Sequence, residues 1–426
     1  MKVLLISANT EKMNMPVLPL GLGCIVSATE RAGHDTALLN LMAREDVREV
    51  LAASIKDFRP DAIGISVRNI DDQNLAAPKF LLEPVKSIVS FCRDQTDCPF
   101  IIGGAGYSIF PQSALEYLGA DMGIQGQGEH AFVLLLERLE RGEDFAGIPG
   151  LYLPEKGLQG KINFKFNLDD FPLPLPGAHL SAPANLQGQQ IWLPFQSRRG
   201  CPMKCSYCST PMIEGPVLHK RNLEQVVDSL SQYVAAGFDR FFFVDNVFNF
   251  PLSYARELCE RVIAKKINMK WRCILYPWKV DEDLVKKMAL AGCEEVSLGF
   301  ESGSARIIKN MNKRYSPDEV RHICNLLKKY HIHIMGFLLL GGPGEDKDTI
   351  TESLAFADSL HTDSMRITVG IRIYPYTPLV RQAVKDGMIT ADEDLLFPKF
   401  YIADDLKMWT IETVKGWIKR RQNWFM

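Results

Sequence analysis

The chain has 426 residues, of which 46% are apolar and 23% are charged, and its formal net charge is −2. This length favours two or three domains, and the composition is that of a globular protein. The small net charge gives no general attraction to phosphate, and no apolar run is long enough to cross a membrane, so nucleic-acid binding and a transmembrane location are not supported. The N-terminus reads as a first strand and not as a signal peptide, which indicates a cytoplasmic protein.

Residues 1–148 alternate between strand-like and helix-like segments. A helical spacing of apolar residues stands out in residues 129–142. Strands that alternate with helices form a doubly wound, Rossmann-like parallel sheet, which binds ligands at the carboxyl ends of its strands. The loops at those ends are rich in Gly or Asn, so a ligand can approach the backbone closely. Apolar runs predict strands near residues 2–8, 35–40, 61–67, 99–105 and 122–128.

Residues 149–188 are crowded with Pro and Gly and predict a hairpin fragment followed by a linker. The alternation of strands and helices resumes in residues 189–380. Six strand–helix units are visible there, fewer than the eight of a full barrel, so we expect a partial (β/α)6 barrel of the TIM type. Chemistry in such folds lies directly after the strands. The polar residues at those positions are Asp245, Asn246, Glu301 and Arg372.

The C-terminal segment, residues 381–426, is predicted to be helical. Its apolar residues recur at helical spacing, with Lys, Arg and Trp residues beside them. A helix packed against its own barrel is the commoner origin of such a stripe. A helix that makes a peripheral contact with a membrane, near a lipid-like substrate, has the same pattern and remains the alternative. The stripe consists of Met408, Ile411, Val414 and Ile418.

Three of the ten cysteines lie close together, in the stretch RRGCPMKCSYCSTP. Cys201, Cys205 and Cys208 are separated by steps of four and three residues. Three thiolates at this spacing suit zinc or an iron–sulfur cluster. A structural zinc needs a fourth ligand, yet no second CxxC and no HxxxH pattern accompanies them. A 4Fe–4S cluster normally takes four cysteines, so three would leave one iron open to another ligand.

The other seven cysteines are scattered along the chain. Ten cysteines in a cytoplasmic protein do not indicate a disulfide framework. We therefore expect these seven to be small buried apolar residues. They are Cys24, Cys92, Cys98, Cys259, Cys273, Cys293 and Cys324.

The CxxxCxxC pattern with Tyr207 before its last cysteine resembles the motif of the radical S-adenosylmethionine enzymes. The segments VSLGFESGS and LLLGGPGE also resemble that superfamily and follow in its order. The resemblance implies that S-adenosylmethionine binds the open iron, that one electron from the reduced cluster breaks its C5′–S bond, and that a 5′-deoxyadenosyl radical then abstracts hydrogen from carbon. It also implies an external one-electron reductant of the flavodoxin or ferredoxin type, and a place for Tyr207 against the adenine or ribose.

The same resemblance suggests further contacts with S-adenosylmethionine. Asp245 and Asn246 stand where family members hold its amino group, although the usual Gly-Gly-Glu is missing there. Glu301 stands where the family often contacts the ribose hydroxyls or the amino group, and a surface salt bridge is the alternative. Arg372 is expected either to bind a carboxylate or to pair with Glu345.

A doubly wound domain in front of such a barrel resembles the cobalamin-binding subclass, the class B methyltransferase-like enzymes. The segments that match are PDAIGISV, IIGGAGYS and ADMGIQGQGE, in which Gln127 replaces the first Glu of a usual Gly-Glu-Gly-Glu. The resemblance implies that Gly103 and Gly104 let the backbone approach the nucleotide tail of cobalamin. The further contacts expected with cobalamin are Asn9, Arg68, Gly126 and Gly128.

The DxHxxG pattern that supplies a histidine ligand in many cobalamin proteins is absent from the loop at residues 7–16. A histidine below the cobalt is therefore not expected. Arg68 follows the third strand and is predicted to lie at that lower face. A cation there cannot ligate cobalt and favours a cobalt without a strong lower ligand. The alternative is that Arg68 pairs with Asp71 or Asp72 and that the domain holds no cofactor.

The sequence therefore predicts an enzyme that methylates a weakly activated carbon of a small-molecule or lipid-like substrate, with a 4Fe–4S cluster, S-adenosylmethionine and cobalamin as cofactors. One S-adenosylmethionine would supply the methyl group and a second would generate the radical. A radical cyclisation, rearrangement or carbon–carbon coupling without methyl transfer is the first alternative. A cobalamin sensor without catalysis is the second, and the intact CxxxCxxC motif argues against it. No side chain is assigned to catalysis on the substrate.

Overall fold

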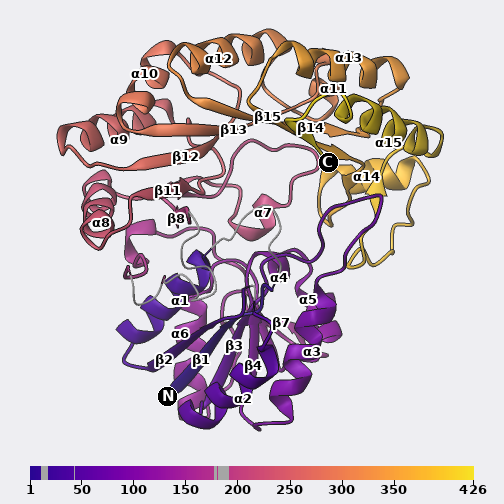
Figure 1. The fold of residues 1–426 in the computed structure, drawn as a ribbon. Coiled ribbons are helices and arrows are strands. Elements are labelled where there is room, and N and C mark those ends of the chain that lie inside the picture. The colour runs from indigo at the N-terminus through magenta and orange to yellow at the C-terminus, as the bar shows by residue number, and fades with distance from the viewer. Residues whose placement is uncertain (11–17, 43, 177–179, 181–190) are drawn as a thin grey trace. The chain divides into compact units, whose positions relative to one another are not determined.

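The computed structural model describes residues 1–10, 18–42, 44–176, 180 and 191–426 of the chain. The chain divides into two compact units, and each unit is built around its own mainly parallel sheet (Figure 1). The first unit consists of Met1–Asp72, Lys79–Ile191 and Ser209–Lys220. The second unit consists of Gln73–Pro78, Trp192–Cys208 and Arg221–Met426.

The sheet of the first unit has the strand order β2-β1-β3-β4-β5-β6-β7. Its first five strands are parallel and its last two are antiparallel. The doubly wound sheet expected from the sequence is therefore confirmed. The hairpin fragment expected after residue 148 adds β6 and β7 to its edge. The strands are β1 (Lys2–Ser7), β2 (Asp35–Asn40), β3 (Ala62–Ser66), β4 (Phe100–Gly103), β5 (Met122–Ile124), β6 (Leu151–Leu153) and β7 (Gly157–Leu158).

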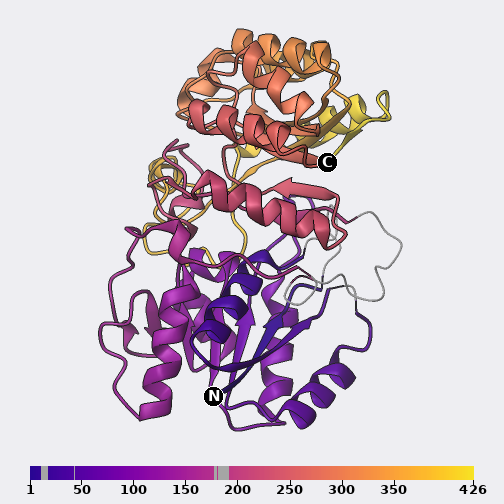
Figure 2. The ribbon, with the colours of Figure 1, turned by 90° about the vertical axis from the view of Figure 1, so that its left-hand side faces the viewer.

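Helices cover both faces of this sheet (Figure 2). Helices α1 (Leu20–Arg31) and α6 (Gly128–Arg141) pack together on one face. Phe132 and Leu135 of α6 are buried against Leu5 and other apolar residues of the sheet, which explains the helical spacing in the sequence. The helices on the other face are α2 (Val47–Phe58), α3 (Leu82–Arg93) and α5 (Pro111–Leu118). The shorter elements of this unit are α4 (Ala105–Ile109), η1 (Leu168–Asp170), α7 (Thr210–Ile213) and β10 (His219–Lys220).

The sheet of the second unit is open and parallel, with the strand order β8-β11-β12-β13-β14-β15-β18. Six of these strands are those expected from the sequence, so the partial barrel is confirmed. The seventh, β18 (Trp424–Phe425), was not predicted because two residues carry no strand pattern. The six are β8 (Leu193–Phe195), β11 (Arg240–Phe243), β12 (Lys270–Leu275), β13 (Cys293–Glu301), β14 (His333–Leu340) and β15 (Ser364–Val369).

A row of helices lies along one side of this second sheet (Figure 1). All of them except α9 begin at a residue whose side chain caps the helix, as in α12, where Ser316 and Glu319 form a reciprocal capping box. The row consists of α8 (Leu223–Ala235), α9 (Leu252–Ala264), α10 (Glu282–Leu290), α12 (Pro317–Lys329) and α13 (Lys347–Ser359). The shorter elements of this unit are β9 (Arg198–Arg199), α11 (Ala305–Asn310), β16 (Ile371–Arg372), α14 (Pro378–Lys385) and β17 (Phe400–Tyr401).

The C-terminal helix α15 (Asp404–Ile418) packs against α13 and β15 of its own unit. Ile411 and Val414 of the apolar stripe are buried, whereas Met408 is 61% exposed. The centre of the stripe is thus covered by the second unit itself, which favours packing against the barrel for these two residues. Among the helices that the structure describes, none has the length and apolar character needed to span a bilayer.

Candidate active site

The cysteine loop, residues 201–208, follows β8 and β9 in the second unit. None of Cys201, Cys205 and Cys208 is in a disulfide, and all three are partly exposed. Burial raises the pKa of the Cys205 thiol, and the nearby Lys313 ammonium partly offsets that rise. Among the described residues, no three His, Cys, Asp or Glu side chains lie close enough to share one metal ion. Three thiols on one loop are nevertheless the donor set of an iron–sulfur cluster, in which each sulfur binds a different iron, so the residues fit that cofactor.

The seven scattered cysteines are also outside any disulfide. Six of them are buried, as expected from the sequence. The expectation is wrong for Cys98, which is partly exposed because it lies in the short connection between α3 and β4.

A segment far away in the sequence braces the cysteine loop. Residues 311–314, which we call the bracing segment, connect α11 to the start of α12. The backbone N–H of Ser206 donates to the carbonyl oxygen of Met311 at 3.1 Å. The side-chain amide of Asn312 donates to the carbonyl oxygen of Lys204 at 2.6 Å. The loop is therefore fixed by groups about a hundred residues downstream of it.

Lys313 of the bracing segment joins two of the expected site residues. Its Nζ donates to the hydroxyl oxygen of Tyr207 at 2.9 Å and to Oε1 of Glu301 at 3.2 Å. The side chain of Lys313 is only 4% exposed and that of Glu301 is 14% exposed. Burial alone lowers the pKa of Lys313, but the negative charge that Tyr207 and Glu301 can carry raises it overall. Sequence reasoning missed Lys313, because no local pattern marks it.

Glu301 lies at an irregularity of the sheet. The register between β13 and β14 shifts between Gly299 and Glu301, and Glu301 has a positive φ of 60°. Such bulges redirect a side chain at the end of a strand. Here the carboxylate reaches Lys313, so the salt bridge that was the alternative for Glu301 does form, but it is largely buried and lies beside the cysteine loop.

Asp245 is placed differently from the expectation. Its carboxylate accepts hydrogen bonds from the backbone N–H and hydroxyl of Ser197, at 2.7 and 2.6 Å, and from the backbone N–H and Nε of Arg198, at 2.9 and 3.0 Å. The side chain of Asp245 is 0% exposed. The carboxylate is therefore a structural anchor for the chain that enters the cysteine loop, and we do not carry it into the S-adenosylmethionine site. Its neighbour Asn246 is half-buried.

Arg372 also has a structural placement. Its guanidinium donates to the carbonyl oxygens of Ile373 and Leu395, both at 2.7 Å, and the residue is 3% exposed. The guanidinium is thus used to hold the chain around β16, and a ligand carboxylate cannot reach it without displacing these bonds. The carboxylate of Glu345 accepts from the backbone N–H groups of Gly341 and Gly342. Burial raises the pKa of Glu345 to about 7.

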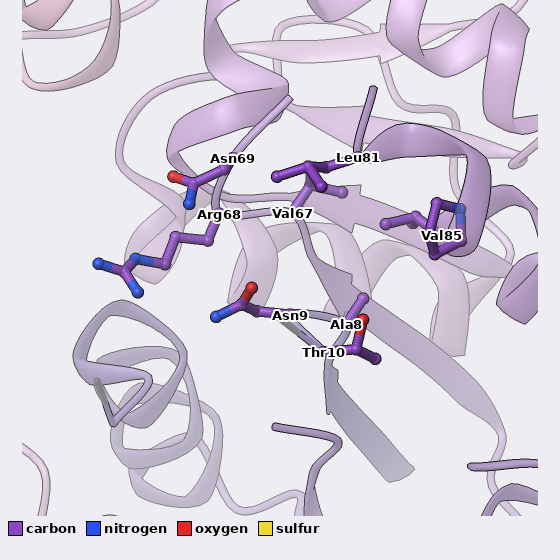
Figure 3. Close-up of a pocket in the computed structure, with 9 residues that line it drawn as sticks. Ala8, Asn9, Thr10, Val67, Arg68, Asn69, Leu81 and Val85 are labelled. Carbon is purple, nitrogen blue, oxygen red and sulfur yellow. The ribbon is translucent and has the colours of Figure 1, made fainter. Parts of the chain in front are cut away.

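In the first unit, a pocket lies at the carboxyl ends of β1 and β3 (Figure 3). The space in it that the centre of a water-sized sphere can occupy is about 20 Å³. The side chains of Asn9 and Arg68 extend in the same general direction from neighbouring strand ends (Figure 3). Arg68 has no ion pair or hydrogen bond with any residue of the described ranges, so pairing with Asp71 or Asp72 is not observed. The pocket is lined by Ala8, Asn9, Thr10, Val67, Arg68, Asn69, Leu81, Pro84 and Val85.

The four glycines expected at cobalamin fall into different classes. Gly104 has a φ of 103°, and a Cβ there would lie 2.5 Å from the carbonyl oxygen of Val67, so the fold itself requires glycine. A Cβ on Gly128 would lie 2.9 Å from Cδ1 of Ile25, which fits close packing of α6 on α1. Gly126 has a φ of 82°. Gly103 differs, since a Cβ there would meet only the Ile124 carbonyl oxygen, at an ordinary contact distance of 3.7 Å.

Gln127, the N-cap residue of α6, carries a buried amide without a partner. Both its Oε1 and its Nε2 are buried and form no hydrogen bond with any described residue. Gln125 provides the contrast, because its Nε2 donates to the Ser108 carbonyl oxygen at 2.9 Å and its Oε1 accepts from the Tyr152 hydroxyl at 3.1 Å. Buried amides normally have partners. The unpaired amide of Gln127 therefore fits a ligand with amide or phosphate groups, which cobalamin has.

Comparisons with known proteins agree with this geometry. Residues 196–357 match the Radical SAM superfamily, and residues 6–136 match the B12 binding domain. An uncharacterized methyltransferase of Pyrococcus horikoshii is 25% identical over 410 residues, which cover 91% of this chain and 84% of the relative. The tryptophan 2-C-methyltransferase of Streptomyces laurentii is 21% identical, with 90% of this chain and 75% of the relative covered.

Two solved structures share the fold. The radical S-adenosylmethionine methyltransferase TsrM from Kitasatospora setae, with cobalamin and a 4Fe–4S cluster bound, superposes with a TM-score of 0.81 at 23% identity, over 90% of this chain and 75% of that one. The cobalamin-dependent radical enzyme OxsB superposes with a TM-score of 0.75 at 17% identity, over 98% of this chain and 67% of that one. By its two matched domains, the chain belongs to the radical S-adenosylmethionine enzymes that carry a cobalamin-binding domain.

Proposed function

We propose that this protein methylates a weakly activated carbon atom of a small molecule, with S-adenosylmethionine as the source of both the methyl group and the radical. The observation that carries the proposal is the loop of three partly exposed thiols, none of them in a disulfide, in a chain that also has a B12 binding domain. The curated relatives named above are methyltransferases, which supports methyl transfer over the other radical outcomes.

In this proposal Cys201, Cys205 and Cys208 hold a 4Fe–4S cluster and leave one iron for S-adenosylmethionine. The cluster supplies the electron that starts the radical reaction, and cobalamin supplies a methyl carrier. Tyr207 offers its ring to the adenine or ribose. Glu301 is held by Lys313 through Oε1, and its Oε2 has no hydrogen-bond partner within the described ranges. That second oxygen can accept a hydrogen bond from the ribose or the amino group.

Asn246 is the remaining proposed contact for S-adenosylmethionine in the second unit. It lies at the carboxyl end of β11, one residue after the buried Asp245. Because Asp245 is fixed by Ser197 and Arg198, the backbone at Asn246 is fixed too. A side chain on a rigid strand end is well placed to orient a ligand.

The proposed contacts for cobalamin are Asn9, Arg68, Gly103, Gly126 and Gln127. Arg68 is a permanent cation and cannot ligate cobalt. Gly103 is the last residue of β4, and Gln127 presents both a donor and an acceptor. Gly104 allows the backbone turn that follows β4, and Gly128 allows α6 to pack closely on α1.

The substrate is proposed to be small. The relatives include a tryptophan 2-C-methyltransferase and a cytidylyl-2-hydroxyethylphosphonate methyltransferase, whose substrates are small molecules of different chemistry. We propose that a flavodoxin or ferredoxin type protein supplies the electron, and that the enzyme works in the reducing cytoplasm, where an oxygen-sensitive cluster survives.

The proposal is tested with anaerobically reconstituted protein that contains cluster and cobalamin. It is incubated with methyl-labelled S-adenosylmethionine, a one-electron reductant and tryptophan as a first substrate probe. We expect S-adenosylhomocysteine and 5′-deoxyadenosine to form together, with S-adenosylhomocysteine formation dependent on cobalamin. Formation of 5′-deoxyadenosine alone, with or without cobalamin, would contradict methyl transfer.

A further inference from the structure

A buried ammonium lies beside the cysteine loop. Lys313 is held between the Tyr207 hydroxyl at 2.9 Å and Glu301 Oε1 at 3.2 Å, and its side chain is 4% exposed. Tyr207 stands between Cys205 and Cys208 in the sequence. The residues just before Lys313 contact the loop as well, since Met311 accepts from the backbone N–H of Ser206 and Asn312 donates to the carbonyl oxygen of Lys204. One fixed positive charge therefore faces the loop that carries the three thiols.

Glu301 opposes this charge. Its carboxylate lies directly against the ammonium, with Oε1 3.2 Å from Nζ of Lys313, so a negative charge stands beside the positive one. Their ion pair is mostly withdrawn from water, since the two side chains are 4% and 14% exposed. Charges in such a site are screened far less than charges at the surface. A change in either member therefore changes the electrostatic potential at the cysteine loop.

We propose that Lys313 is a positioning residue that raises the reduction potential of the cluster, and that Glu301 lowers it. The inference rests on the proposed function, because it concerns the cluster held by the three cysteines. Reduction adds one negative charge to the cluster, so a nearby cation stabilises the reduced form and a nearby carboxylate destabilises it. The protein thus has a built-in means to make the first electron transfer easier.

A purely structural role is the competing explanation, because Lys313 also ties Tyr207 to the end of β13. The two explanations differ in the sign of their effects. Loss of a structural tie perturbs the cluster in the same way whichever partner is removed. Loss of charge shifts the potential downward for Lys313 and upward for Glu301.

The test is a redox titration of the reconstituted cluster, followed by electron paramagnetic resonance, without S-adenosylmethionine. For K313Q we expect the ratio of reduced to oxidised cluster at a fixed solution potential to fall about tenfold, which is about 59 mV for one electron. For E301Q we expect a shift of similar size in the opposite direction. The double variant E301Q/K313Q and the charge-preserving K313R should stay close to the parent protein.

Iron content and far-ultraviolet circular dichroism are measured on each variant beforehand. A parent protein that takes up no iron would refute the proposed function itself. A parent with an intact cluster and unchanged potentials in both single variants would overturn only the role of Lys313. Shifts of the same sign in K313Q and E301Q would also overturn it. If K313Q takes up no cluster, the test rests on E301Q. A reduction potential of E301Q that is not higher than that of the parent protein would then overturn the proposal.

Discussion

Two buried side chains, one from each unit, differ in how their polar groups are satisfied. In the second unit, the ammonium of Lys313 beside the cysteine loop donates to the Tyr207 hydroxyl and to Glu301. In the first unit, the side-chain amide of Gln127 has no hydrogen-bond partner within the described ranges. A compact cluster held by three thiols needs a rigid, prepared loop, whereas a large cofactor such as cobalamin can itself complete the hydrogen bonds of the domain that binds it.

The largest effect on cofactor content is expected from substitution of a cysteine in the loop. C205A should remove the bound cluster, because two thiolates remain and a 4Fe–4S cluster needs at least three here. Acid-labile sulfide and iron should fall to background, and 5′-deoxyadenosine formation should stop. The matched control is C98A, since Cys98 is also partly exposed and outside any disulfide but lies in the first unit. Equal iron loss in both variants would contradict the assignment of the loop.

The second-largest effect is expected at the anchor below the loop. D245A would leave the guanidinium of Arg198, which is 1% exposed, without its carboxylate. Breaking a buried ion pair from one side typically destabilises a protein by about 3–5 kcal/mol. Denaturant unfolding of the second unit should show a loss of this order.

The control for D245A is E257A, which removes an exposed partner of Arg261. Solvent screens that pair, so its loss should have a far smaller effect. If D245A were as stable as E257A, the buried anchor would not hold the loop as described.

Glu345 is one of the buried groups of the second unit that are only partly satisfied, because its Oε1 has no hydrogen-bond partner within the described ranges. Folding raises the pKa of this carboxyl from its ordinary 4.5 to about 7, chiefly through burial. The folded protein therefore keeps a proton that the unfolded chain loses, and the free energy of unfolding should fall as the pH rises from 4.5 to 7. The expected loss is up to about 3 kcal/mol.

E345Q provides the check on this pH dependence. A neutral amide cannot titrate, so the difference in unfolding free energy between the parent and E345Q should follow the parent's decline over that window and level off above pH 7. Parallel pH profiles for the two proteins would show that Glu345 is not buried as described.

The smallest effect compares two neighbouring glutamines in the first unit. Q127M removes a buried amide that lacks partners. In the cobalamin-free protein, the substitution should therefore raise the free energy of unfolding by about 1 kcal/mol. It should also weaken cobalamin binding about tenfold. Q125M removes an amide with two partners and should do the reverse, with lower stability and unchanged affinity. Equilibrium dialysis with hydroxocobalamin and thermal unfolding measure both quantities. If Q125M bound cobalamin more weakly and Q127M bound it unchanged, the proposed role of Gln127 would be contradicted.

Much of the fold was predictable because its signals are local. The strands of both sheets are short apolar runs, and α6 and α12 carry a helical spacing or a capping box. The edge strand β18 was missed because its pairing with β15 depends on tertiary contact. Short strands of this kind have no pattern of their own.

The site was predictable only where the motif itself is local. The cysteines and Tyr207 stand together in the sequence, whereas Lys313 meets Tyr207 from 106 residues away. Asp245 shows what sequence position leaves out. A carboxylate directly after a strand looks available for a ligand, but Ser197 and Arg198, on the neighbouring strand end, already occupy it. Sequence position does not reveal whether a polar group is already paired.

The central claim is that one chain holds both a cluster and a cobalamin at two separate sites. It is tested most directly by the anaerobic absorption spectrum of protein reconstituted with iron, sulfide and hydroxocobalamin and then desalted. We predict iron–sulfur and corrin bands together in the parent protein, and corrin bands alone in C205A. A desalted parent protein that shows the cluster without any corrin band would contradict the account of the first unit.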